Sequence, residues 1–137
     1  MNPFSKVVLL VDDSATVRRM MEWALKSFGL RTLQAVDGLS ALEVLKSRTV
    51  DLAIVDLNMP RMDGIELVRA LRADERWKKL PVLLLTTEQR AEDRELARAA
   101  GVNAYLTKPA DPEQLRRQVE ALVGSAGPVG GGREATS

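Results

Sequence analysis

The sequence contains no cysteine and no histidine among its 137 residues. It therefore has no thiol for a disulfide, no thiolate or imidazole for a zinc site, and no Ser-His or Cys-His pair for nucleophilic catalysis. Any chemistry must come from carboxylates, hydroxyls and lysine amines. A bound metal would have to be a hard, oxygen-coordinated cation such as Mg²⁺ or Ca²⁺.

An excess of charge of either sign is also missing, because 20 lysines and arginines nearly balance 19 aspartates and glutamates. A formal net charge of +1 provides no basic field for a nucleic-acid backbone, so we expect no direct contact with nucleic acid. No apolar run reaches the length of a membrane span, and the first residues, MNPFSK, lack the pattern of a signal peptide. We therefore expect no membrane insertion, a cytoplasmic location and a single domain.

What the chain does contain is an alternation of short apolar runs with helix-length amphipathic stretches. The clearest runs are too short for helices and are apolar at every position, as in strands that are covered on both faces. This alternation predicts an α/β fold, a doubly wound parallel sheet of five strands with helices on both faces. The expected strands are 7–11, 31–35, 52–55, 82–85 and 103–106, and the expected helices are 15–28, 39–47, 64–73, 91–100 and 112–123.

The composition changes near the end of the chain, where residues 124–137 read GSAGPVGGGREATS. Glycine and small polar residues leave little to bury and nothing to fix the backbone. We expect a folded domain over 1–123 and a disordered glycine-rich tail over 124–137. A linker to a further domain is an alternative interpretation of the same composition.

Polar side chains follow four of the expected strands. Asp12 and Asp13 come after the first strand, Asp56 after the third, and Thr86 and Lys108 after the fourth and fifth. Because parallel strands deliver their carboxyl ends to one edge of a sheet, these side chains should meet in one crevice. An isolated Asp-Asp pair is usually turn or cap chemistry. Three carboxylates facing a lysine are better explained as a site for Mg²⁺, which prefers oxygen ligands.

Four short motifs carry these residues in the order VDDS, DLNMPRMDG, LLLTTE and YLTKP. Together they resemble the receiver domains of two-component response regulators, and most closely the single-domain chemotaxis type. The resemblance covers about residues 5–123. It implies a flavodoxin-like receiver fold with the strand order 2-1-3-4-5, for which a chemotaxis regulator is itself a standard example.

The resemblance implies that Asp56 accepts a phosphoryl group from the phosphohistidine of a partner histidine kinase. It also implies a Mg²⁺ ion on Asp13, Asp56 and the backbone carbonyl of Asn58. Asp12 would bind the ion through water, and Lys108 would hold a phosphoryl oxygen. These roles agree with the chemistry, because a carboxylate that attacks an anionic phosphoryl group needs its charge offset. On this interpretation the protein is not a conventional enzyme and catalyses only its own phosphorylation and dephosphorylation.

The resemblance also implies residues that respond to phosphorylation of Asp56 and residues that set the lifetime of the phosphoryl group. Thr86 would move toward the phosphoryl group and allow the ring of Tyr105 to turn inward. The alternative for Tyr105 is an ordinary half-buried aromatic of the sheet. Asn58 and Glu88 would tune the phosphoryl lifetime. We expect a downstream output protein to bind the face formed within 91–123, and we expect the protein to be a monomer that acts in chemotaxis or motility.

Other functional hypotheses remain open from the residues alone. A phosphohydrolase with an aspartate nucleophile is one, although such enzymes resemble DxD after the first strand, whereas Asp12 and Asp13 are adjacent. A phosphorelay intermediate and an interaction module that needs no phosphate are two more. Repulsion within the acid cluster disfavours the interaction module, and it predicts that neutralising Asp12 or Asp13 stabilises the metal-free protein.

Three local expectations concern packing. Gly64 is expected to serve the turn that closes the loop over the site, where a Cβ would restrict the backbone. Helix 91–100 is expected to pack loosely, because its apolar anchors are only Leu96 and small alanines. Ser14 and Asp111 are expected to cap the helices that follow them.

Overall fold

Five strands and five helices alternate along the chain in the computed structural model, which describes residues 6–87 and 90–124. The elements are β1 (Val7–Val11), α1 (Ala15–Lys26), β2 (Arg31–Ala35), α2 (Gly38–Ser47), β3 (Leu52–Asp56), α3 (Gly64–Arg72), β4 (Val82–Thr86), α4 (Ala91–Ala100), β5 (Ala104–Thr107) and α5 (Pro112–Val123). The strands form one parallel sheet in the order β2-β1-β3-β4-β5. This confirms the predicted fold class and strand order.

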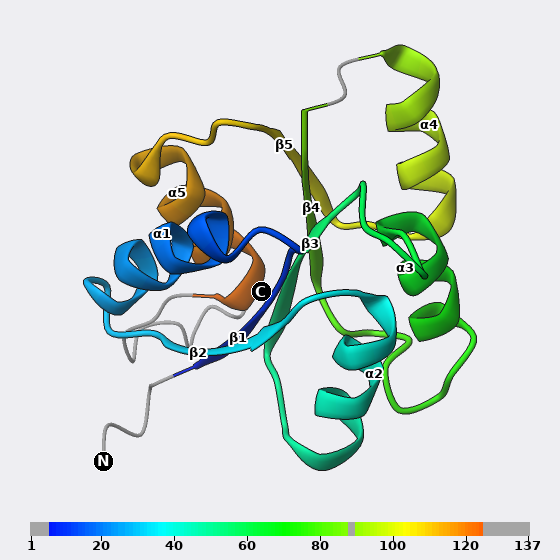
Figure 1. The fold of residues 1–137 in the computed structure, drawn as a ribbon, viewed down its shortest axis with the longest axis horizontal. Coiled ribbons are helices and arrows are strands. Elements are labelled where there is room, and N and C mark those ends of the chain that lie inside the picture. The colour runs from blue at the N-terminus through cyan, green and yellow to red at the C-terminus, as the bar shows by residue number, and fades with distance from the viewer. Residues whose placement is uncertain (1–5, 88–89, 125–137) are drawn as a thin grey trace.

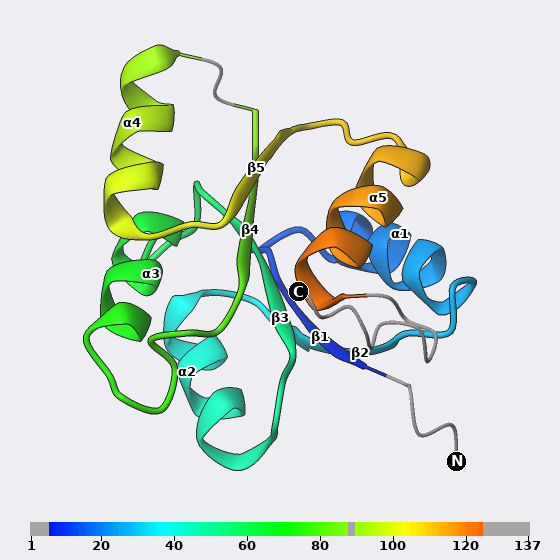
Figure 2. The same cartoon turned by 180° about the vertical axis from the view of Figure 1, so that it is seen from behind.

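Helices cover both faces of the sheet. Figure 1 shows α1 and α5 on one side and α2, α3 and α4 on the other, and Figure 2 shows the same layers from behind. Alternate side chains of a strand point to opposite faces. Leu9, Val55 and Leu84 accordingly belong to the apolar layer under α2, α3 and α4, while Ile54 and Leu83 belong to the layer under α1 and α5. Both layers need apolar residues, which is why the central strands are apolar at nearly every position.

Side-chain caps start four of the helices and leave the fifth without one. Each capping oxygen accepts a backbone N–H from the first turn, where such groups have no partner within the helix. The caps predicted at Ser14 and Asp111 are confirmed. The fifth helix, α4, begins after Arg90, which makes no side-chain cap. The four capping residues are Ser14 before α1, Asp37 before α2, Asp63 before α3 and Asp111 before α5.

The predicted apolar anchors of α4 are confirmed for the alanines and wrong for Leu96, whose side chain is 49% exposed. The buried residues of α4 are Ala97 and Ala100, which join the apolar layer shared with α2 and α3. On its buried side α4 is therefore held by the small methyl groups of alanine.

The carboxyl end of α4 is fixed by an arginine from α3. Arg72 donates from Nε and Nη2 to the carbonyl oxygen of Gly101, at 3.0 and 2.8 Å, and from Nη2 to Oδ1 of Asn103, at 3.0 Å. The same guanidinium donates to the carbonyl of Trp77. At the amino end of α4, Arg90 makes no side-chain cap and forms an ion pair with Asp93 at 3.0 Å.

Gly64 is required by close packing and not by a turn, so the predicted reason was wrong. Its φ does not lie in the left-handed region; in the connection between β3 and α3 it is Arg61 that has a positive φ, 67°. A Cβ on Gly64 would lie 2.6 Å from the carbonyl oxygen of Asp56 and 3.0 Å from Cα of Leu57. Because both atoms belong to the backbone, neither can move away without displacing Asp56 itself.

Within the described residues, none of the helices is long and apolar enough to cross a membrane. The fold described here ends at Gly124, so the predicted tail over 124–137 lies, apart from that residue, outside the described residues. The predicted residue Glu88 lies outside them as well. The predicted strands and helices otherwise agree with the structure to within two residues at each end.

Substitution of Gly64 by alanine tests this packing. We expect Gly64→Ala to lower the free energy of unfolding by about 2–3 kcal/mol, because the added methyl group overpacks the backbone of β3. Gly29→Ala is the control, since Gly29 has a φ of 83° but open space around it. Its cost should be about 1 kcal/mol from the left-handed backbone alone. Urea unfolding of both variants measures the difference, and equal losses would contradict the steric explanation.

Candidate functional site

The candidate site lies at the carboxyl edge of the sheet, where the sequence predicted it. Asp12 and Asp13 directly follow β1, Asp56 is the last residue of β3, and Thr86 is the last residue of β4. Lys108 follows β5, and its backbone N–H donates to the carbonyl of Thr86 at 2.7 Å. The parallel register brings these strand ends together. The predicted convergence is confirmed for Asp12, Asp13, Asp56 and Lys108, while Thr86 is placed at the same edge by its backbone.

Lys108 bridges two of the three carboxylates. Its Nζ lies 2.8 Å from Oδ2 of Asp12 and 3.3 Å from Oδ1 of Asp56. Asp12 is 1% exposed and Asp56 is 6% exposed, so both charges are largely removed from water. A buried ion pair of this kind requires good geometry and further hydrogen bonds to offset desolvation. The backbone N–H of Ser14 supplies one, to Oδ1 of Asp12 at 2.8 Å.

Asp13 completes an acid cluster that could hold a cation. One carboxylate oxygen each from Asp12, Asp13 and Asp56 lies within 4.8 Å of the other two. Asp13 is exposed, whereas the other two are buried, so the cluster opens to solvent on one side. An all-oxygen site that is open to water fits Mg²⁺, which retains several waters when it binds proteins.

The ionisation of Asp56 is disfavoured by its surroundings. Burial raises the pKa of Asp56 above its ordinary value and the charge of Asp12 raises it further, while Lys108 and a hydrogen bond from the backbone of Asn58 act in the opposite direction. A carboxyl group whose pKa is raised by folding contributes stability at low pH that is lost as the pH rises through the raised value. The ionised Asp56 therefore weakens the fold at neutral pH, and a bound cation would relieve that cost.

Lys108 remains charged in the same surroundings. Burial by itself would lower its pKa, but the hydrogen bond to Asp12 and the charges of Asp56 and Asp12 outweigh burial and raise the pKa above its ordinary value. At neutral pH the site therefore contains a fixed ammonium group between two carboxylates. This arrangement provides a donor beside Asp56 that needs little reorganisation to bind an anionic group.

The other predicted residues surround the acid cluster in the loop after β3 and on β4 and β5. Asn58 is exposed in the connection that follows β3. Thr86 is fully buried, and Tyr105 is half-buried and packs against the layer beneath α2, α3 and α4. Register pairs Thr86 with Thr107 and Leu84 with Tyr105, so Thr86 and Tyr105 lie diagonally on one face of the sheet. The guanidinium of Arg94 in α4 lies 5.4 Å from the centre of the Tyr105 ring.

Two residues near the site were not predicted from the sequence. Asp37, only 3% exposed, caps α2 and forms an ion pair with Arg61 from the connection after β3. Ser40 completes a capping box with Asp37, and this Asp-x-x-Ser spacing is the one signal the sequence offers for it. The ion pair joins segments 24 residues apart, which periodicity cannot indicate.

Comparisons with known proteins agree with this geometry. The family model of the response regulator receiver domain matches residues 8–120. Over 116 residues the chain is 43% identical to the chemotaxis protein CheY of Pseudomonas aeruginosa, which covers 84% of this chain and 94% of that protein. The chemotaxis protein CheY4 of Vibrio cholerae has a TM-score of 0.82 at 36% identity, covering 86% of this chain and 98% of that one.

A further solved structure bears on the acid cluster. It is the receiver domain of the sensor histidine kinase PA1611 from Pseudomonas aeruginosa, with a magnesium ion coordinated in its active site cleft. Its TM-score is 0.81 at 31% identity, covering 88% of this chain and 99% of that one. The magnesium ion belongs to that protein, and the acid cluster of this chain is formed by Asp12, Asp13 and Asp56.

The chain therefore belongs to the response regulator receiver family. Within that family it is similar to the CheY-type chemotaxis response regulators. Receiver domains are signalling proteins that interact with histidine kinases and with downstream targets, and they bind Mg²⁺ in their acidic pocket.

Because Lys108 forms an ion pair with Asp12, we expect neutralisation of Asp12 and of Asp13 to change the free energy of unfolding in opposite directions. Asp13→Asn should raise the free energy of unfolding of the metal-free protein by about 0.5–1 kcal/mol, because it relieves repulsion within the cluster. Asp12→Asn should lower it instead, because the buried Lys108 loses its nearest carboxylate partner. The sequence alone had suggested the same sign for both substitutions.

Urea unfolding with and without saturating Mg²⁺ measures these effects. Wild-type protein should gain more stability from Mg²⁺ than Asp13→Asn does, because a cation that binds only the folded state stabilises it by mass action. A metal-free Asp13→Asn variant that is less stable than wild type would contradict the repulsive cluster.

Proposed function

We propose that the protein is a phosphoacceptor switch in which Asp56 takes a phosphoryl group from the phosphohistidine of a partner histidine kinase. The observation that carries the proposal is the position of Asp56, which ends a buried strand, lies 3.3 Å from the ammonium of Lys108 and shares an oxygen cluster with two further aspartates. A nucleophilic carboxylate, a fixed cation and a hard-cation site are the three elements that phosphoryl transfer to a carboxylate needs.

In the proposed transfer, a carboxylate oxygen of Asp56 attacks the phosphorus atom of the donor. The new O–P bond forms as the P–N bond to the donor imidazole breaks, and the imidazole leaves with the electron pair of that bond. Lys108 has three N–H donors, and its donors to Asp12 and Asp56 can turn to a phosphoryl oxygen as the group arrives. The same residues serve loss of the phosphoryl group to water, so the protein would catalyse both steps on itself alone.

Asp13, Asp56 and the backbone carbonyl of Asn58 would hold Mg²⁺, with Asp12 acting through water. When bound, the ion supplies positive charge that offsets the repulsion between the phosphoryl group and the carboxylates. The exposure of Asp13 leaves space for the waters that Mg²⁺ keeps. Asn58 and Glu88 would tune the access of the attacking water and thereby the phosphoryl lifetime.

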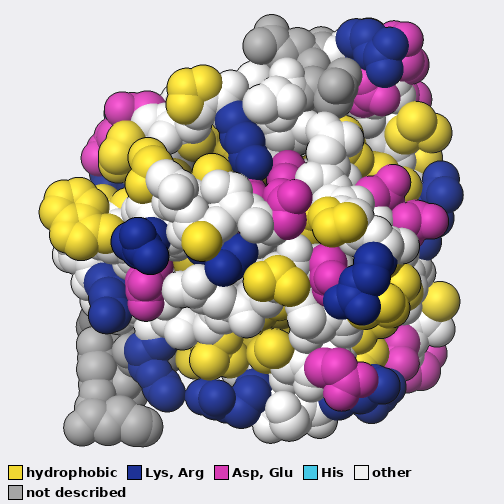
Figure 3. All heavy atoms as spheres, viewed as in Figure 1, with side chains coloured by type: hydrophobic (Ala, Val, Ile, Leu, Met, Phe, Trp, Pro, Cys, Tyr) yellow, Lys and Arg dark blue, Asp and Glu magenta, His cyan; other side chains and the backbone are white. Residues whose placement is uncertain are grey.

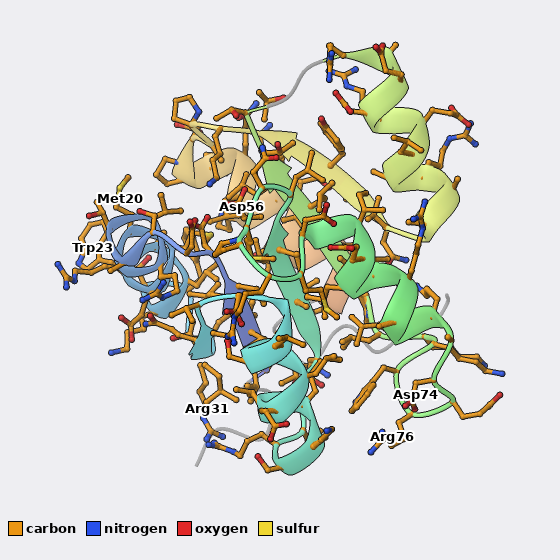
Figure 4. The ribbon with its side chains drawn as sticks, turned by 45° about the vertical axis from the view of Figure 1, so that its right-hand side comes forward. Met20, Trp23, Arg31, Asp56, Asp74 and Arg76 are labelled. Atoms are coloured by element: carbon orange, nitrogen blue, oxygen red, sulfur yellow. The ribbon has the colours of Figure 1, made fainter. Side chains whose placement is uncertain are left out.

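A protein donor must cover the surface beside Asp56 during transfer, and that surface is partly apolar. A groove of about 350 Å³ between α1 and α5 is lined mainly by apolar side chains and reaches Lys108 at its edge. Met20 and Trp23 of α1 are 63% and 75% exposed. Figure 3 shows hydrophobic side chains gathered over α1 and α5, and Figure 4 shows Met20 and Trp23 projecting outward from α1. We assign this surface to contact with the phosphodonor.

The output of the switch would be the face formed by α4, β5 and α5. Movement of Thr86 toward a phosphoryl group on Asp56 would open space for the ring of Tyr105, which lies diagonally beside it on the sheet. Since Arg94 lies over that ring, an inward turn of Tyr105 changes the surface of α4. A downstream protein, in chemotaxis or motility, would bind the changed face. We further propose that the protein acts as a cytoplasmic monomer.

Phosphorylation by a small donor tests the chemistry directly. Acetyl phosphate with Mg²⁺ should add one phosphoryl group to wild-type protein and none to Asp56→Asn, as measured by intact mass. Lys108→Arg should slow the reaction by at least about tenfold, because a guanidinium cannot replace a compact ammonium between two buried carboxylates. Equal phosphorylation of Asp56→Asn would overturn the assignment of Asp56.

A phosphomonoester turnover assay with Mg²⁺ distinguishes the switch from a phosphohydrolase. A receiver should show no multiple turnover of such a substrate, whereas sustained turnover that is lost in Asp56→Asn would favour the enzyme. Transfer of label from the phosphorylated protein to a second histidine-containing protein would instead indicate a phosphorelay intermediate.

Amide hydrogen exchange tests the route from Asp56 to the output face. With the phosphate mimic beryllofluoride and Mg²⁺, we expect protection to change in β5 around Tyr105 and in the amino-terminal half of α4. The carboxyl end of α4 should change less, because Arg72 holds Gly101 and Asn103. Changes confined to the connections around Asp56 would contradict the proposed coupling.

A further inference from the structure

The connection from Leu57 to Asp63, here called the β3–α3 loop, is attached to the start of α2. Arg61 in the loop donates from Nε to Oδ2 of Asp37 at 2.8 Å, and its Nη2 contacts the same oxygen. We propose that Asp37 and Arg61 are positioning residues for phosphoryl transfer, acting as a latch that holds the β3–α3 loop, and with it Asn58, in the conformation that binds Mg²⁺. The proposal rests on the proposed function of the acid cluster.

Both carboxylate oxygens of Asp37 have a hydrogen-bond partner. Its Oδ1 accepts the backbone N–H of Ser40 at 2.8 Å and thereby caps α2, while Oδ2 faces Arg61. The hydrogen bond from Ser40 and the guanidinium of Arg61 hold the pKa of Asp37 below its ordinary value, so it remains charged. Capping α2 uses only one carboxylate oxygen. The second oxygen, which points to another segment, is not explained by the helix.

Arg61 adopts a backbone conformation that it would not choose by itself. Its φ of 67° lies in the left-handed region, where a residue with a Cβ is disfavoured. Such a conformation persists when the surrounding contacts determine it. The ion pair with the buried Asp37 is a contact of that kind, although the Arg61 side chain is 58% exposed.

A second contact joins the same two segments. Met62 packs against Gly38, the first residue of α2, so closely that a Cβ on Gly38 would lie 2.7–2.8 Å from Cβ, Cγ and Sδ of Met62. The loop is thus attached to α2 through two consecutive residues, each meeting one of the two residues at the start of the helix.

The latch determines the middle of a loop whose ends are fixed separately. At the far end, the backbone N–H of Gly64 donates to the carbonyl of Leu57 at 2.9 Å, and Asp63 forms a capping box with Glu66. At the near end, Asp56 belongs to β3. Asn58 lies between these anchors, and its backbone N–H donates to the Asp56 carboxylate while the residue as a whole is exposed. The orientation of its carbonyl toward a cation therefore depends on how the rest of the loop is held.

Arg61→Ala breaks the latch, and Arg76→Ala is a matched control. The Arg76 side chain is 59% exposed and forms an ion pair with Asp74, so both variants remove one equally exposed, paired guanidinium. Figure 4 shows Asp74 and Arg76 far from Asp56, at the opposite end of the molecule. We expect Arg61→Ala to weaken Mg²⁺ binding by about tenfold, as loss of a supporting contact around a metal site typically does. Isothermal titration of the unphosphorylated protein with Mg²⁺ measures the effect.

Charge by itself predicts the opposite result. Removal of a positive charge near three carboxylates strengthens the attraction for Mg²⁺, so a weaker affinity in Arg61→Ala can only come from a change in the loop. Arg61→Lys should restore part of the affinity because an ammonium can still reach Asp37. Arg61→Gly should bind as weakly as Arg61→Ala, whereas wild-type affinity in that variant would show that backbone strain, and not the ion pair, sets the loop.

A metal-free measurement separates failure of the latch from failure of the proposed function. Amides of residues 57–63 should exchange about tenfold faster in metal-free Arg61→Ala than in wild type, and at the wild-type rate in Arg76→Ala. Unchanged exchange in Arg61→Ala, or Mg²⁺ affinity equal to or tighter than wild type, would overturn the latch even if Asp56 is phosphorylated. Failure of acetyl phosphate to label Asp56 would overturn the proposed function and leave the exchange result as it stands.

Discussion

The ammonium of Lys108, placed between the carboxylates of Asp12 and Asp56, is the interaction on which the site depends. The parallel sheet forces these strand ends together, and without a cation among them the acids would be both buried and mutually repelling. Lys108 does not fully offset burial and the charge of Asp12, since the pKa of Asp56 is still raised. Ionisation of Asp56 therefore still costs free energy in the folded protein, and a divalent cation beside the carboxylate would lower that cost.

Contacts from the starts of α3 and α2 hold the backbone around Asp56 in place. Gly64 brings the start of α3 against the carbonyl of Asp56, at a distance that leaves no space for a side chain. The β3–α3 loop then returns past the start of α2, where Asp37 and Met62 make their contacts. Chemistry at Asp56 is thus supported from both neighbouring helices, although neither helix contributes a reacting group.

The opposite requirement applies to the proposed output face. α4 is held by two alanines on its buried side and by Arg72 at its carboxyl end, and its amino end has no side-chain cap. A helix held on its buried side mainly by small apolar side chains can respond to small changes in the strand beneath it at little cost in free energy. The rigidity around Asp56 and the weaker restraint on α4 belong together, because a switch must convert a local chemical change into movement elsewhere.

The sequence by itself determined the fold class, the order of elements and the convergence of Asp12, Asp13, Asp56, Thr86 and Lys108, because these follow from apolar periodicity and from the geometry of parallel strands. Capping residues such as Ser14 and Asp111 could also be predicted from the sequence, since a helix end is a local feature. Only the tertiary structure decided that Leu96 faces solvent, that Gly64 is required by contact with Asp56, and that Lys108 gives Asp12 and Asp13 different roles. The ion pair between Asp37 and Arg61 could likewise not be predicted from the sequence. Each of these depends on distances between segments far apart in the chain, which residue type and spacing do not contain.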